Sequence, residues 1–128
     1  MNKQQGDRAE ALAILYYTSL GFIVSKPLNH SSYYDLIVDN GDKLIKVECK
    51  SSRHKENEKS YTVSLRTNGG NQSFNKVSKK IDSSKVDEIF ILDGDGYYYV
   101  FESEKLNNRS TVNVNKQIPE CLGFFSLK

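Results

Sequence analysis

The chain has 128 residues, a net charge of +2, 38% hydrophobic and 27% charged side chains, and two cysteines. These values are ordinary for a globular protein, and the length predicts one domain over residues 1–128. Two cysteines exclude a disulfide scaffold. No apolar run approaches the roughly 20 residues that cross a bilayer, so we expect no membrane-spanning helix and no membrane partner.

A helix is the first expected element. Residues 1–8 are polar and lack the apolar core of a signal peptide, which predicts an intracellular, cytoplasmic protein. The expected helix would end at Gly21, and an alternating strand, Phe22–Lys26, would follow it. The predicted helix, Gly6–Leu20, carries one apolar stripe at helical spacing, formed by Ala9, Leu12, Ala13, Tyr16 and Leu20.

A hairpin is the most informative stretch. Tyr33–Asp39 and Asp42–Ser51 are both strand-like, and Asn40-Gly41 between them is the strongest short hairpin signal. A two-residue turn at Asn40-Gly41 would place Asp35 opposite Lys46. Side chains alternate between the two faces of a strand. One face would then hold Leu36, Val38, Ile45, Val47 and Cys49 as a core, and the other would hold Asp35, Lys46, Glu48 and Lys50.

Strands dominate the rest of the chain. A helical turn is expected at Ser103–Leu106, and residues 67–80 are expected to be a loop or a short helix. One long helix, a run of strands and small helices together predict an α/β (α+β) fold, a mixed β-sheet flanked by helices. The later strands are predicted at Tyr61–Leu65, Glu88–Leu92, Tyr97–Glu102 and Thr111–Val114.

The polar face of the hairpin suits phosphodiester chemistry. Asp35 and Glu48 would be diagonal neighbours roughly 7–8 Å apart, able to share one Mg²⁺, with Mn²⁺ as a substitute. The backbone carbonyl of Cys49 is a further candidate ligand. Lys50 would orient the attacking water or stabilise charge on the phosphate, and Glu10 on the helix would hold a metal-bound water or a second cation. The alternative is the polar side of an ordinary solvated sheet.

A basic block occupies the middle of the chain. Residues 43–80 contain ten lysines and arginines against three glutamates. Such a block is typical of a surface that docks a polyanion, although a solvated lysine-rich surface has the same composition. We expect Arg53 and Lys55 to meet DNA phosphates. Arg, Asn and Gln read base edges, so further candidate contacts to double-stranded DNA are Arg66, Asn68, Asn71, Gln72, Asn75 and Lys76.

Tyr34-Asp35, followed by Glu48-Cys49-Lys50, resembles the PD-(D/E)xK nuclease signature. Tyr34 stands where that signature has its proline, which is not a ligand. The expected order of helix, strand and hairpin is also present, and residues 5–107 look most like the group I intron-associated PD-(D/E)xK homing endonucleases. The resemblance implies a restriction-endonuclease-like core, Mg²⁺-dependent cleavage of both strands at a specific DNA site, and a homo-oligomer. It is compatible with a gene carried by a phage or another mobile element.

Two alternatives to a homing-type enzyme stay open. Archaeal-type Holliday junction resolvases share the helix glutamate, the aspartate and the ExK strand. A non-catalytic DNA-binding domain would use the same scaffold, but it would gain nothing from buried carboxylates facing phosphates. One chain carries one site, whereas symmetric cleavage of two antiparallel strands needs two, so we expect a dimer or a tetramer.

Overall fold

A six-stranded mixed sheet forms the centre of the protein. The structure is a computed structural model, and it describes residues 3–30, 33–68 and 78–126. Strands β3 and β7 are parallel, whereas the other neighbouring pairs are antiparallel. The strands, in spatial order, are β1 (Ile23–Ser25), β2 (Leu36–Asp39), β3 (Leu44–Ser52), β7 (Glu88–Asp93), β8 (Tyr97–Glu102) and β10 (Cys121–Phe124).

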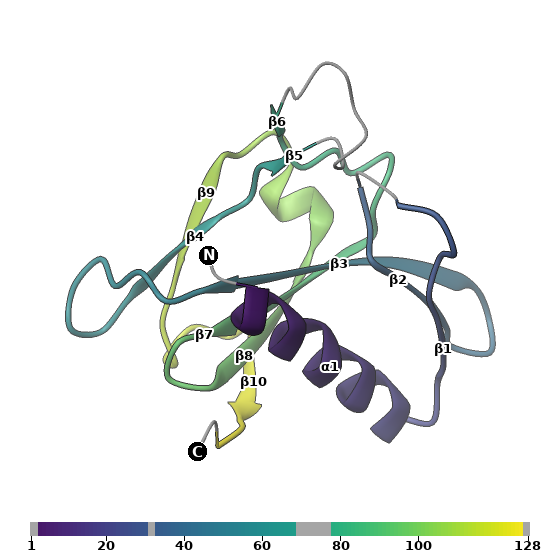
Figure 1. Cartoon of the computed structure of the whole chain (residues 1–128), viewed down its shortest axis with the longest axis horizontal. Coiled ribbons are helices and arrows are strands. Elements are labelled where there is room, and N and C mark those ends of the chain that lie inside the picture. Colours follow the sequence, from purple (N-terminus) through teal and green to yellow (C-terminus); the bar gives the residue numbers. More distant parts are fainter. Residues whose placement is uncertain (1–2, 31–32, 69–77, 127–128) are drawn as a thin grey trace.

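Both faces of the sheet are covered, which explains the unbroken apolar run in β7. Phe90 and Leu92 pack under α1 (Lys3–Ser19), and Ile89 and Ile91 pack on the other side. That other side is covered by the antiparallel pair β4 (Tyr61–Ser64) and β9 (Thr111–Val114) and by the short 3-10 helix η1 (Ser103–Leu106). Figure 1 shows α1 lying across the sheet. The predicted α/β (α+β) fold with a mixed sheet is therefore confirmed; among the described residues, α1 covers one face, and β4, β9 and η1 cover the other.

The helix buries a stripe that differs from the expected one at its end. Ala9, Leu12 and Ala13 are buried as predicted, but Leu20 is 49% exposed. The helix ends at Ser19, so Leu20 no longer follows the helical spacing. Tyr17 takes its place in the core, and its hydroxyl donates a hydrogen bond to Glu88 Oε1 at 2.7 Å.

The hairpin turn lies one residue later than predicted. Asn40 N–H donates to Lys43 O at 3.2 Å, so the central residues of the turn are Gly41 and Asp42. Gly41 has a φ of 93°, which glycine adopts without strain. Lys46 consequently pairs with Ile37, and its predicted pairing with Asp35 is wrong. A slip of two residues leaves every side chain on its predicted face.

Other elements agree with the expected positions or add to them. β8, η1 and β9 have the predicted bounds, and β7 and β8 form the predicted hairpin. The loop or helix expected at residues 67–80 is wrong at both ends, since β5 (Thr67–Asn68) pairs with β6 (Ser78–Lys79). Strand β10 was not predicted. In the part of the chain that the structure describes, no helix is long and apolar enough to cross a membrane.

Candidate active site

The candidate site lies where β2 diverges from β3. The regular register pairs Leu36 with Val47, yet the N–H of Asp35 also donates to Val47 O, at 2.8 Å. The pairing therefore shifts by one residue at Asp35, and such irregularities redirect side chains. Asp35 Oδ2 accepts the backbone N–H of Cys49 at 2.7 Å. The carboxylate thus lies against the edge of β3 beyond the end of β2 rather than opposite Lys46.

Glu48 and Lys50 flank this contact along β3. Glu48 is only 6% exposed. Lys50 Nζ lies 3.1 Å from Glu48 Oε1 and donates a hydrogen bond to Arg66 O at 3.2 Å. Residues two apart on a strand point to the same side, so the chain itself brings the ammonium to the carboxylate. The structure therefore brings together three of the predicted site residues, Asp35, Glu48 and Lys50.

Both carboxyl groups are harder to ionise than in water. The pKa of Glu48 is raised to about 7, chiefly by burial; within that net shift the positive charge of Lys50 lowers the pKa, and the charge of Asp35 raises it. Burial also raises the pKa of Asp35, an effect that the Cys49 N–H opposes and the charge of Glu10 adds to. Two acids that disfavour each other's ionisation create a place where a bound cation is strongly favoured.

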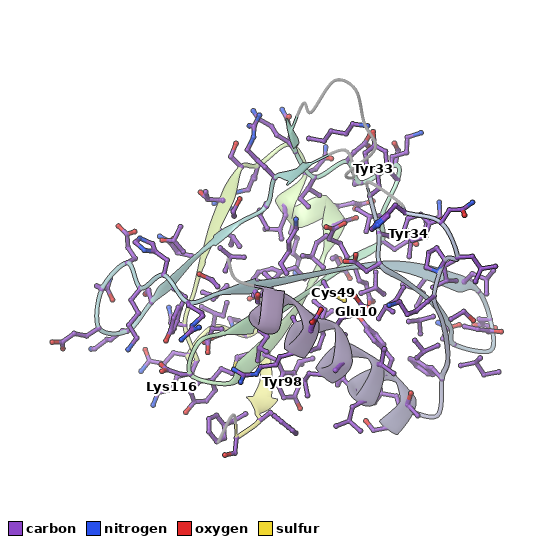
Figure 2. The ribbon with its side chains drawn as sticks, in the orientation of Figure 1. Glu10, Tyr33, Tyr34, Cys49, Tyr98 and Lys116 are labelled. Carbon is purple, nitrogen blue, oxygen red and sulfur yellow. The ribbon has the colours of Figure 1, made fainter. Side chains whose placement is uncertain are left out.

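Glu10 approaches the site from the helix. It forms an ion pair with Lys26. Lys26 was predicted to lie in a strand, and no role in the site was predicted for it. The charges of Glu10, Lys26 and Lys50 all act on the Asp35 carboxyl, so Asp35 lies between the helix side and the β3 side. Figure 2 shows Glu10 on α1 close to Cys49. Glu10, Lys26 and Asp35 line one pocket of about 180 Å³.

The donor set fits a hard divalent cation. Cys49 N–H faces Asp35, and the N–H and C=O of one strand residue point to the same side, so the Cys49 carbonyl also faces this edge. Two carboxylates and a carbonyl are oxygen ligands of the kind that Mg²⁺ takes, together with waters and substrate phosphate. Within the described residues, no group of three or more His, Cys, Asp or Glu side chains is placed to hold a metal. An all-side-chain cage of that kind is therefore not present there.

The predicted DNA contacts are spread over the molecule. Arg66 lies beside the site, since its carbonyl accepts from Lys50. Lys55 lies further along, over the ring of Tyr61 and 3.8 Å from Asp95 Oδ2. Arg53 is exposed near Tyr61, and Asn68 is in β5. The remaining candidates, Asn71, Gln72, Asn75 and Lys76, lie outside the described residues.

The protein has a mixed sheet with a helix on one face. Where two of its strands separate, acidic side chains lie beside a lysine. These features define the restriction-endonuclease-like class. A family model described as PD-(D/E)XK endonuclease matches residues 1–120, so the chain belongs to this family. The resemblance seen in the sequence is thereby confirmed.

Two solved structures are similar to the chain. One is a bacterial homing endonuclease, I-Ssp6803I, with 27% identity, a TM-score of 0.70, and coverage of 92% of this chain and 78% of that chain. The other is Archaeoglobus fulgidus Hjc, a Holliday junction resolvase, with 12% identity, a TM-score of 0.51, and coverage of 91% and 89%. The second likeness is one of fold alone. No curated protein matches the chain significantly.

Proposed function

We propose that this nuclease is a Mg²⁺-dependent, site-specific endonuclease of the homing type that cleaves double-stranded DNA. The observation that carries the proposal is the convergence of Asp35, Glu48 and Lys50 at one edge of β3. The 27% identity and 0.70 TM-score with a bacterial homing endonuclease favour the homing type over a junction resolvase. The enzyme would act on DNA in the cytoplasm as a single-domain chain.

Each of the protein groups would have a separate role in the cleavage reaction. Asp35, Glu48 and the Cys49 carbonyl would hold the cation, for which Mn²⁺ is a substitute. When bound, the cation polarises the phosphate and lowers the pKa of water. Lys50 would stabilise the charge that gathers on the phosphate, and its place beside Glu48 keeps its ammonium near the reacting oxygen atoms. Glu10 would orient a water on the helix side of Asp35.

Symmetric cleavage of both DNA strands would use two copies of the chain. Each copy supplies one site, and the two strands of a duplex are antiparallel, so a two-fold axis relates the two reactions. We propose a dimer or a dimer of dimers.

Cleavage of two substrates tests the proposal. Purified protein is incubated with plasmid containing candidate target sites, or with a synthetic four-way junction, in Mg²⁺ or in EDTA. The proposal expects Mg²⁺-dependent linearisation of plasmid that Lys50→Ala abolishes. A preference for the junction would replace the homing function by that of a resolvase. Cleavage that is indifferent to EDTA or to Lys50→Ala would refute the mechanism.

A further inference from the structure

A basic hollow beside the candidate site is not used by the proposed cleavage chemistry. It has a volume of about 660 Å³, and its lining includes Tyr33, Arg66, Lys79, Lys80 and Asp82. Three of these side chains are cationic and one is anionic. Asp82 Oδ1 accepts the N–H of Ser84 at 3.0 Å and its hydroxyl at 2.6 Å, so this carboxylate is engaged within its own turn. We call this feature the Tyr33 hollow.

The ring of Tyr33 gathers two ammonium groups. Lys79 Nζ lies 4.8 Å from the ring centroid and Lys85 Nζ lies 5.9 Å from it. The ring attracts each cation, whereas the two cations repel each other. An anion bound beside the ammonium groups would offset that repulsion and would add charge-assisted hydrogen bonds. The cluster is therefore suited to a compact, strongly accepting anion such as a phosphate.

The Tyr33 hollow adjoins the candidate active site. Arg66 lines the hollow, its Nη1 donates a hydrogen bond to Ser110 Oγ at 3.2 Å, and its carbonyl accepts the hydrogen bond of Lys50. Tyr33 is two residues before Asp35, a span of at most about 7 Å. One DNA strand rises about 3.4 Å per nucleotide. A strand with a phosphate at Asp35 would thus carry the phosphate of a nearby nucleotide past the hollow.

We propose that the Tyr33 hollow binds a backbone phosphate of the DNA strand being cut, close to the scissile phosphate, through Lys79 and Arg66 of its lining and through Lys85, which lies beside the ring of Tyr33. The inference rests on the proposed function, because it assumes that a phosphodiester occupies the site at Asp35. Its role is to fix the position of the strand. None of its residues is needed to hold the cation.

The salt dependence of DNA binding tests this site. Each neutralised phosphate contributes about 0.9 to the slope of log affinity against log salt concentration. In an inactive Glu48→Gln background in EDTA, Lys79→Gln with Lys85→Gln is expected to lower the slope by about one, because one phosphate contact is lost. Tyr33→Leu is expected to lower it as well, because the ammonium groups lose their shared ring, whereas Tyr33→Phe keeps it.

A matched control lies far from the hollow. Lys116 Nζ lies 5.7 Å from the centroid of Tyr97, a contact of the same kind, and Lys59 lines the same pocket as Lys116. Figure 2 shows Lys116 and Tyr33 at opposite sides of the molecule. Lys59→Gln with Lys116→Gln is expected to leave the slope unchanged. Equal slopes in the two double variants would overturn the inference. The slope is measured without cleavage, so it tests this inference separately from the proposed function. If the protein without substitutions cleaved no DNA in Mg²⁺, that result would instead refute the proposed function.

Discussion

Lys50 Nζ lies 3.1 Å from Glu48 Oε1, and the two side chains are only 12% and 8% exposed. A nearly buried ammonium therefore neighbours the carboxylate that we propose binds the cation. Its positive charge lowers the pKa of Glu48, in opposition to the larger effect of burial. The proposed function thus gives Lys50 two effects that separate experimentally: it would keep Glu48 ready to bind a metal ion, and it would stabilise charge on the phosphate.

Replacing Lys50 by methionine separates these effects. Lys50→Met is expected to reduce cleavage at least about 100-fold, since one preorganised charge-stabilising donor contributes about that much. The pH midpoint of metal binding is expected to rise, because Glu48 loses the charge that lowers its pKa. Titration of Mn²⁺ at several pH values measures the midpoint. A midpoint that does not move would show that the ion pair has no electrostatic influence on the site.

The stability of the metal-free protein is expected to depend on Glu48. The folded-state pKa of about 7 exceeds the ordinary value of 4.5, so the folded state binds the proton more tightly than the unfolded state. This contribution is complete below about pH 4.5 and is lost as the pH rises through about 7. The loss is roughly 3 kcal/mol, at about 1.4 kcal/mol per pH unit.

Urea unfolding in EDTA at several pH values measures this dependence. Glu48→Gln has no carboxyl to ionise, so its free energy of unfolding is expected to fall less than that of the parent over the same range. Addition of Mg²⁺ is expected to restore stability to the parent above about pH 7, and not to the variant. Parallel pH profiles for the two proteins would contradict the assignment of this titration to Glu48.

Glu10 is expected to contribute to catalysis but little to the stability of the fold. Its ion pair with Lys26 is partly exposed, with side-chain exposures of 27% and 60%, and exposed pairs contribute less than about 1 kcal/mol. Glu10→Gln is therefore expected to unfold at nearly the parent urea concentration, yet to cleave more than about tenfold more slowly. Asp7→Asn, an exposed change on the same helix, is the control and is expected to cleave normally.

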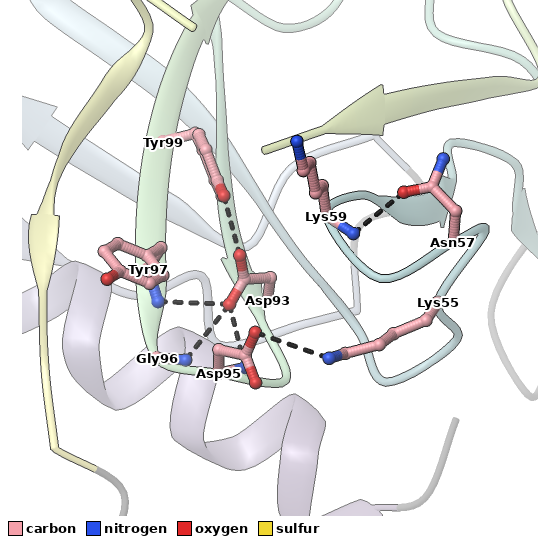
Figure 3. A network of polar contacts seen from close by, with 8 residues as sticks. All are labelled: Lys55, Asn57, Lys59, Asp93, Asp95, Gly96, Tyr97 and Tyr99. Atoms are coloured by element: carbon pink, nitrogen blue, oxygen red, sulfur yellow. Dashed lines mark hydrogen bonds and ion pairs between the residues drawn. The ribbon is translucent and has the colours of Figure 1, made fainter. Parts of the chain in front are cut away.

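Asp93 is expected to stabilise the fold at the far end of β7. Its Oδ1 accepts the N–H groups of Asp95, Gly96 and Tyr97 at 2.9, 3.0 and 3.1 Å, and its Oδ2 accepts the hydroxyl of Tyr99 at 2.6 Å (Figure 3). Asp93 is 2% exposed, and Asp93→Ala removes the carboxylate acceptor of all four groups, including the buried hydroxyl of Tyr99. The expected loss is about 2–4 kcal/mol in urea unfolding. Asp95→Ala, which removes an exposed carboxylate, is expected to cost less than about 1 kcal/mol.

Local patterns were sufficient to predict the face of the hairpin but not its register. Asn40 Oδ1 accepts the N–H groups of both Asp42 and Lys43, at 2.9 Å each, and this moves the turn to Gly41-Asp42. Nothing in the dipeptide signal distinguishes the two turns. The faces were nevertheless predicted correctly, because a register error of two residues conserves the alternation.

Contacts between distant parts of the chain escaped prediction. The Lys26–Glu10 pair and the Lys50–Arg66 hydrogen bond join elements whose approach depends on the whole sheet. β10 also has no strong alternating pattern of its own, and it is recognisable as a strand only through its pairing with β8. The shift at Asp35, which turns its carboxylate toward Cys49, follows from the end of β2 rather than from any residue pattern.

The location of a bound cation tests the central claim most directly. Crystals of the protein with uncleaved DNA and Mn²⁺ would show the ion by its anomalous scattering. We expect a peak within about 2.0–2.3 Å of one oxygen each from Asp35, Glu48 and the Cys49 carbonyl, the ordinary range for hard divalent cations. An anomalous peak at another position, in a complex that cleaves its DNA when the crystals are warmed, would contradict the account.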